Sequence, residues 1–284
     1  MSTIEKALDK LKADSGKGRP SDASRSRDGR SGSRGNVESD SVISLPWPEM
    51  EAQGMLTPDG GRSEIAEELR AIKRPLLKNA FAHDNFAAKR SNLIMVTSSV
   101  PGEGKSFTSI NLAISIAMEL DRTALLVDAD VARPSIARYL GFKAKAGLVD
   151  YLLDDNIALS DVLIKTDLPK LSILPAGKQH HYSTELLASE NMNILLDELA
   201  TRYHDRVIIF DSPPVLATSE AQVLATQMGQ VVIVVEAVKT SQSALKEALS
   251  KISQVNIAGL VLNKSRVKKG GSHYEYGYYG HKGE

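Results

Sequence analysis

The chain has 284 residues, 42% of them hydrophobic, with 35 basic and 35 acidic side chains. This length allows one large domain with tails or two small domains, and the balanced charge gives no reason to expect nucleic-acid binding. The absence of cysteine excludes disulfides, thiol catalysis and cysteine-based zinc sites, and no apolar run approaches the ~20 residues of a membrane-spanning helix, so we expect a cytoplasmic protein.

The first 62 residues form two segments of different composition. Residues 1–13 predict a short amphipathic helix with one apolar face, made of Ile4, Ala7, Leu8 and Leu11. Because so short a helix is marginal alone, it either forms on docking or remains a frayed tail. Residues 14–62 are rich in Ser, Gly, Arg and Asp, which predicts a disordered linker with Trp47 as a candidate docking residue.

From residue 63 to residue 265 the pattern predicts one ordered domain. Ser63 is placed to cap a helix with acidic residues in its first turn, and Pro75 is expected to stop or kink that helix. Further apolar patterns predict helices over 134–140, 147–153, 185–203 and 241–253, and strands over 93–96, 123–128, 207–210, 231–236 and 257–262. Residues 171–177 are predicted to form a strand and a turn.

A phosphate-binding loop follows the first of these strands. Residues 98–106 read S-S-V-P-G-E-G-K-S, and a helical pattern runs on from Phe107. In such a loop, backbone N–H groups and the helix N-terminus bind phosphate oxygens, Lys105 reaches the β- and γ-phosphates, and Ser106 ligates Mg²⁺. The alternative is a glycine-rich turn that binds nothing, which the flanking strand and helix disfavour. The expected nucleotide-binding residues here are Pro101, Gly102, Glu103, Gly104, Lys105, Ser106 and Phe107.

Polar residues follow three other predicted strands. Asp128 and Asp130 end the second strand, and Asp211 follows four apolar residues in the Walker B form. Carboxyl ends of parallel strands are where an open α/β sheet binds ligands, so these carboxylates favour a functional reading over ordinary turn residues. Asn263 follows the last strand and is expected to meet the nucleotide base, although a turn asparagine is nearly as good a reading.

The last segment, residues 266–284, is a predicted flexible tail. It contains half of the eight tyrosines, at Tyr274, Tyr276, Tyr278 and Tyr279. Because no apolar periodicity accompanies them, they are either a sticky aromatic tail or a set of phosphate acceptors beside an ATP site.

These motifs resemble those of the bacterial P-loop tyrosine kinases (BY-kinases) that control exopolysaccharide synthesis and export. The resemblance covers about residues 63–284, and the first eleven residues and residues 72–77 are similar to the exosortase-associated tyrosine autokinases. It implies an α/β P-loop NTPase fold of the MinD-like (SIMIBI) type, a three-layer αβα sandwich with a mostly parallel sheet. It also implies an ATP- and Mg²⁺-dependent autokinase whose catalytic residues are Lys105, Asp128, Asp130 and Asp211.

The resemblance further assigns individual roles. Ser106, Asp130 and Asp211 would hold the metal, and Asp128 would orient or deprotonate the tyrosine hydroxyl. Family members form rings through a helix motif Glu-x-x-Arg-x-x-Arg, which here is Glu67, Arg70 and Lys73; Lys does not make the bidentate contact of Arg. The implied partners are a transmembrane chain-length regulator, through which the protein would lie at the inner membrane, and a cognate tyrosine phosphatase.

Two other classes of protein compete with this reading. A partitioning or site-placement ATPase of the ParA/MinD kind would carry a second lysine early in the loop, where this chain has Val100. A scaffold that binds nucleotide without transferring phosphate is the other alternative, and the intact Lys105 and its carboxylates argue against it.

Overall fold

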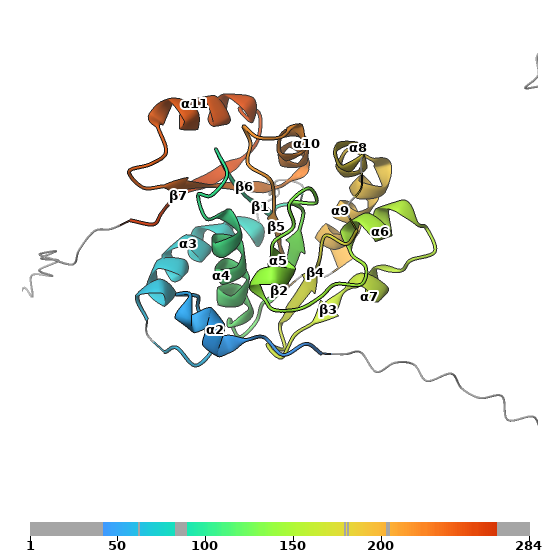
Figure 1. Cartoon of the computed structure of the whole chain (residues 1–284), viewed down its shortest axis with the longest axis horizontal. Coiled ribbons are helices and arrows are strands. Elements are labelled where there is room, and N and C mark those ends of the chain that lie inside the picture. Colours follow the sequence, from blue (N-terminus) through green and yellow to red (C-terminus); the bar gives the residue numbers. More distant parts are fainter. Residues whose placement is uncertain are drawn as a thin grey trace, which may run out of the picture. The chain divides into compact units, whose positions relative to one another are not determined.

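A computed structural model describes residues 42–61, 63–82, 90–178, 180, 182–202 and 205–265 (Figure 1). The predicted N-terminal helix over residues 1–13 and the four tail tyrosines lie outside these residues. Within the described ranges, no helix is both long enough and apolar enough to cross a membrane.

A seven-stranded sheet organises the described residues, in the order β3-β4-β2-β5-β1-β6-β7. All neighbouring strands pair in parallel except β3 and β4, which are antiparallel. The predicted mostly parallel α/β sheet is therefore confirmed. The strands are β1 (Leu93–Ser98), β2 (Thr123–Asp128), β3 (Ile164–Lys165), β4 (Leu171–Leu174), β5 (Arg206–Asp211), β6 (Gln230–Glu236) and β7 (Ile257–Asn263).

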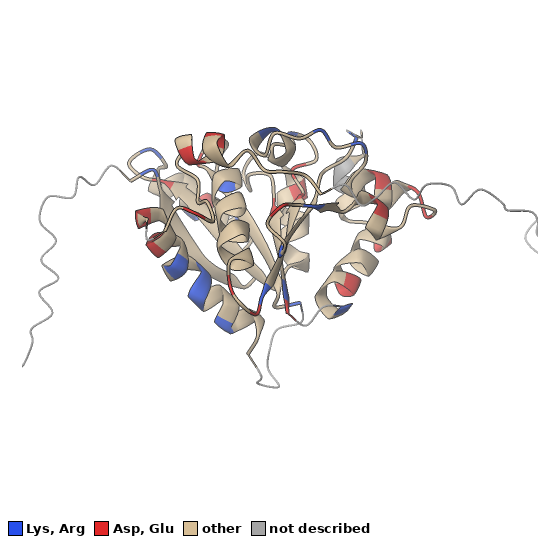
Figure 2. Cartoon of the chain, turned by 90° about the horizontal axis from the view of Figure 1, so that it is seen from below, with Lys and Arg blue, Asp and Glu red and all other residues tan. Residues whose placement is uncertain are grey.

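Helices cover both faces of the sheet, which gives three layers (Figure 1). Successive residues of β1 alternate between the two apolar clusters, Leu93 and Met95 facing one and Ile94 and Val96 the other. Charged residues of the central strands stand only at strand ends, as expected for strands buried on both faces (Figure 2). The helices are α2 (Trp47–Ala52), α3 (Glu64–Ala80), α4 (Lys105–Ala117), α5 (Ile136–Tyr139), α6 (Leu148–Leu153), α7 (Leu159–Val162), α8 (Ser183–Leu187), α9 (Glu190–Arg202), α10 (Ser219–Gln227) and α11 (Gln242–Lys251).

The prediction of a disordered linker up to residue 62 is wrong for residues 42–61. This segment contains α2, and it buries Leu45, Met50, Met55 and Leu56 in the cluster beneath α3 and α4. Polar contacts secure it as well: the Leu56 N–H donates to Asn111 Oδ1 at 2.6 Å. Trp47, predicted as a docking residue, packs against the same cluster and donates its Nε1–H to Asp167 at 3.1 Å.

Helix boundaries also differ in two places. The Ser63 hydroxyl caps α3 as predicted, accepting from the Ala66 N–H. Pro75 does not stop the helix, which continues to Ala80. Burial of Leu76 and Ala80 stabilises the turns that follow the proline. The single helix predicted over 185–203 is two helices, α8 and α9. Ser189 begins the second one, since its hydroxyl accepts from the Met192 N–H at 3.2 Å.

Candidate active site

A cavity of about 800 Å³ lies where β1 turns into α4, at the carboxyl edge of the sheet. Of the seven loop residues predicted to bind nucleotide, all but Glu103 line it: Pro101, Gly102, Gly104, Lys105, Ser106 and Phe107. Asp130 and Asn263 also line it. The structure therefore brings the loop together with two residues that stand far from it in the sequence.

Two glycines give the loop its shape. Gly102 has φ of +91° and Gly104 has φ of +100°, in the region that side chains disfavour. A Cβ on Gly104 would also lie only 2.0 Å from Asn263 Nδ2. The glycine at position 104 is thus required by backbone conformation and by close approach of the last strand.

The Glu103 side chain braces the loop from outside the cavity. It is buried, and its carboxylate accepts from the Val100 N–H at 2.8 Å and from the Thr240 hydroxyl. Its carboxylate is therefore engaged within the fold, and the predicted contact of Glu103 with a nucleotide would be made by its backbone N–H. Sequence reasoning missed this role because Thr240 stands 137 positions away.

The end of β7 binds two carbonyls of the loop. Asn263 Nδ2 donates to the Glu103 carbonyl at 2.9 Å, and Lys264 Nζ donates to the Gly102 carbonyl at 2.6 Å. Lys264 also pairs with Glu236 at 3.2 Å. These bonds fix the backbone of the loop, whose N–H groups are the donors expected to meet phosphate oxygens.

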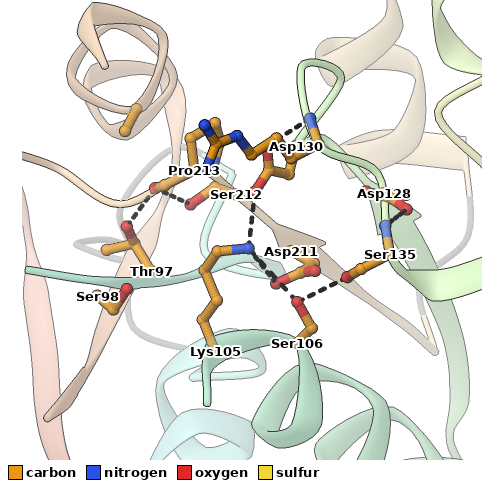
Figure 3. Close-up of polar contacts among 12 residues, drawn as sticks. Thr97, Ser98, Lys105, Ser106, Asp128, Asp130, Ser135, Asp211, Ser212 and Pro213 are labelled. Atoms are coloured by element: carbon orange, nitrogen blue, oxygen red, sulfur yellow. Dashed lines mark hydrogen bonds and ion pairs between the residues drawn. The ribbon is translucent and has the colours of Figure 1, made fainter. Parts of the chain in front are cut away.

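Lys105 lies between two of the predicted carboxylates (Figure 3). Its Nζ is 2.8 Å from Asp130 Oδ2 and 3.8 Å from Asp211 Oδ1. Burial lowers the pKa of Lys105, but Asp211 and Asp130 outweigh burial and leave the pKa above its usual value. Lys105 is therefore a permanent cation at the floor of the cavity.

Asp128 and Asp211 end neighbouring strands and face each other in register. Asp211 is fully buried, Ser109 donates to its Oδ1 at 3.2 Å, and its Oδ2 has no partner. Burial raises the pKa of Asp211, although Lys105 opposes the rise. Asp128 Oδ2 accepts from the N–H groups of Ser135 and Ile136 at 3.0 Å, and its Oδ1 has no partner.

The Asp128 carboxyl is also perturbed by its surroundings. Burial raises its pKa to about 7, and the neighbouring Asp211 adds to the rise. Its side chain is not among those that line the cavity. It lies just beneath the cavity floor, where the two N–H groups at the start of α5 fix one of its oxygens.

The oxygen donors of this floor fit Mg²⁺, which prefers oxygen ligands and keeps several of its waters. Ser106 Oγ lies 2.9 Å from Ser135 Oγ (Figure 3), and two carboxylate oxygens nearby are buried without partners. Among the described residues, no three His, Cys, Asp or Glu side chains are grouped closely enough to hold a metal alone. A metal here would therefore share its ligands with Ser106, phosphate oxygens and water.

The three residues predicted for a ring interface do not share one exposed surface. Glu67 and Arg70 form an ion pair on the outer side of α3. Lys73 is buried, and its Nζ donates to the Ser115 carbonyl at 2.7 Å and pairs with Glu119 at 2.6 Å. The prediction that Lys73 contacts another subunit is therefore wrong, because the Lys73 side chain is buried within this chain, where it links α3 to the end of α4.

Comparison with known proteins supports a common family. A family model described as an AAA domain matches residues 91–265. The tyrosine-protein kinase Ptk of Acinetobacter johnsonii is 32% identical over 199 residues, which is 69% of this chain and 26% of Ptk. The tyrosine-protein kinase YwqD of Bacillus subtilis (strain 168) is 33% identical over 192 residues, 66% of this chain and 78% of YwqD.

Solved structures agree with the sequence comparison. The kinase domain of the Escherichia coli tyrosine kinase ETK aligns with 84% of this chain and 93% of that domain, with a TM-score of 0.65 and 26% identity. The chain spans only about a quarter of the length of Ptk, but more than three quarters of YwqD.

Proposed function

We propose that this chain, which belongs to the family of bacterial tyrosine-protein kinases, transfers the γ-phosphate of ATP to tyrosines of its own tail and so regulates exopolysaccharide polymerisation or export. The observation that carries the proposal is the position of Lys105, 2.8 Å from Asp130 and 3.8 Å from Asp211, at the floor of a cavity walled by the phosphate-binding loop.

Phosphoryl transfer depends mainly on positioning and on neutralising charge, and this site has groups for both. The loop N–H groups and Lys105 would hold the phosphates, and Asn263 would lie at the base. Ser106, Asp130 and Asp211 would hold Mg²⁺, which supplies charge neutralisation on the phosphate oxygens when bound. Lys105 would exchange its present carboxylate partners for phosphate oxygens.

Asp128 is our candidate for the proton acceptor. A proton acceptor works best when its pKa lies near the working pH, and burial brings the pKa of this carboxyl to about 7. Its unpartnered Oδ1 leaves one oxygen free to take the proton that leaves the tyrosine hydroxyl. The backbone N–H groups of Ser135 and Ile136 keep the other oxygen in place.

The proposed acceptors are Tyr274, Tyr276, Tyr278 and Tyr279. Each phosphate would add roughly −1.5 to −2 charges, enough to change association with other chains. Family membership supports three partners: further copies of this chain, a transmembrane chain-length regulator that brings the kinase to the membrane, and a phosphatase that resets the tail.

Incubation of the full chain with γ-labelled ATP and Mg²⁺ tests the proposal. Label should appear on tyrosine, disappear when the four tail tyrosines are changed to Phe, and persist in the control Tyr182→Phe, which changes an exposed tyrosine outside the tail. Hydrolysis of ATP without labelled protein would favour a partitioning ATPase, and nucleotide binding without either reaction would favour a scaffold.

A further inference from the structure

The cavity is lined by more than the phosphate-binding loop and Lys105. Its lining residues also include two guanidinium groups, from Arg133 and Arg138, and an aromatic ring, from Tyr139. The proposed function assigns the loop and Lys105 to the nucleotide and gives these three residues no role.

Both arginines stand on backbone that the active-site carboxylates hold in place. The Arg133 N–H donates to Asp130 Oδ1 at 3.1 Å. Arg138 lies on α5, whose first N–H groups are bound by Asp128. The positions of both arginines are therefore tied to the position of the catalytic floor.

Neither arginine takes part in any of the ion pairs found among the described residues. Both are exposed, and the Arg138 guanidinium lies 5.6 Å from the centre of the Tyr139 ring. Two accessible guanidinium groups beside an aromatic wall suit a ligand that carries both a carboxylate and an aromatic ring.

We infer that Arg133 and Arg138 bind an acidic side chain adjacent to the acceptor tyrosine, while Tyr139 packs against a tyrosine ring. The inference rests on the proposed function and deepens it by naming the substrate class, a tyrosine next to an acidic residue. The occupant is the tail of this chain, in which Glu275 stands between Tyr274 and Tyr276. Arginine is suited to the role because its planar fork binds a carboxylate through two hydrogen bonds.

Two synthetic peptides test the inference. One has the sequence of residues 270–281, and the other carries Glu275→Gln. The enzyme is the full chain with the four tail tyrosines changed to Phe and with its own Glu275→Gln, so that its tail offers neither acceptor nor acid. We expect the KM of the glutamate peptide to be roughly fivefold lower than that of the glutamine peptide, with equal kcat.

Variants of the enzyme then identify the residues that cause the preference for the glutamate peptide. Arg133→Gln combined with Arg138→Gln should raise the KM of the glutamate peptide to that of the glutamine peptide. The matched control Lys143→Gln combined with Lys145→Gln removes two nearby positive charges that do not line the cavity, and it should keep the preference. Equal KM values for the two peptides with the unmodified site would overturn the inference. So would a double arginine variant that keeps the preference and raises the KM of ATP, because the arginines would then serve the nucleotide.

Peptide affinity separates failure of this inference from failure of the kinase proposal. Fluorescence anisotropy with a non-hydrolysable ATP analogue measures binding of both peptides without any reaction. Tighter binding of the glutamate peptide, lost in the double arginine variant, would support the subsite even if no peptide is phosphorylated. Equal affinities would refute the subsite even if both peptides are phosphorylated.

Discussion

Both ends of the parallel sheet bury polar side chains, but the two ends differ in whether the buried polar atoms have hydrogen-bond partners. At the amino end, Gln230 donates to the carbonyls of Leu76 and Ser91 and accepts from Asn79, and Asn92 donates to two further carbonyls. At the carboxyl end, Asp128 and Asp211 each bury an oxygen with no partner. Unpartnered buried carboxylate oxygens are costly.

This difference separates groups that stabilise the fold from groups kept for chemistry. One oxygen near the amino end, Oε1 of Gln227, also lacks a partner, but it belongs to a neutral amide and costs less than a carboxylate oxygen. We therefore expect changes at the carboxyl end to reduce catalysis without destabilising the fold, and changes at the amino end to destabilise the fold without reducing catalysis. Four predictions test this comparison.

The largest effect should follow Lys105→Met. This change removes the only cation paired with Asp130 and Asp211 among the described residues, and with it the positive charge opposite the transferred phosphate. Phosphotyrosine formation should fall at least a thousandfold, which is at least about 4 kcal/mol of transition-state stabilisation. The rate of labelling with γ-labelled ATP is the measurement. Lys251→Met, on an exposed helix end, is the control and should keep the rate.

Asp128→Asn should lower the rate of tyrosine phosphorylation, while it raises the stability of the fold by an amount that depends on pH. The pKa of Asp128 is about 7 in the folded chain against 3.8 ordinarily, so the folded state binds its proton more tightly than the unfolded state. The stabilisation from this carboxyl is complete below about pH 4 and is lost as the pH rises through 7, a change of up to about 4 kcal/mol. Asparagine does not titrate, and its amide oxygen still accepts from Ser135 and Ile136.

Urea unfolding at pH 4, 6 and 8 without nucleotide measures this difference. Relative to wild type, the variant should gain stability steadily towards pH 8, while its rate of tyrosine phosphorylation falls roughly a hundredfold. A variant that keeps the wild-type rate would remove Asp128 from the role of proton acceptor. Asp167→Asn, which changes a carboxylate outside the cavity lining, should keep the wild-type rate.

At the amino end, Gln230→Ala should destabilise the fold and spare the site. It leaves two buried carbonyls and the Asn79 amide without their partner, at a cost of about 2–3 kcal/mol. Chemical denaturation should register this loss, while the Kd of ATP measured below the unfolding transition stays at its wild-type value. The exposed Gln254→Ala is the control. An ATP affinity that falls with stability would mean that the two ends of the sheet are coupled.

The sequence was sufficient for the features that depend on consecutive residues. The strand before the loop, the loop glycines, and the aspartates that end β2 and β5 were all predicted, because apolar runs, positive-φ glycines and strand ends have local signatures. Parallel pairing then brought Asp128 opposite Asp211. These parts of the site need no knowledge of distant contacts.

The features that escaped prediction depend on contacts between distant segments. The apolar residues of the segment around Met50 are spaced irregularly among prolines, without the period of a helix or a strand, and the segment is held by hydrogen bonds to Asn111 and Asp167. Lys73 reads as an exposed residue of an amphipathic helix, yet Ser115 and Glu119 surround its Nζ. No local pattern signals that a lysine after the last strand reaches the phosphate-binding loop.

That lysine provides the smallest of the four predicted effects. Lys264→Ala removes the donor to the Gly102 carbonyl, at 2.6 Å, and the partner of Glu236. Because its side chain is half exposed, we expect a loss of about 1 kcal/mol, seen as a roughly fivefold increase in the Kd of ATP with little change in kcat. Lys239→Ala is a matched control, since Lys239 pairs with the same Glu236 carboxylate at 3.2 Å but does not line the cavity. If both variants weaken ATP binding equally, the charge on Glu236 matters and the contact with Gly102 does not. If only Lys264→Ala weakens it, the contact with Gly102 positions the phosphate-binding loop, and the carboxyl end of the sheet owes part of its binding function to the side chain that follows β7.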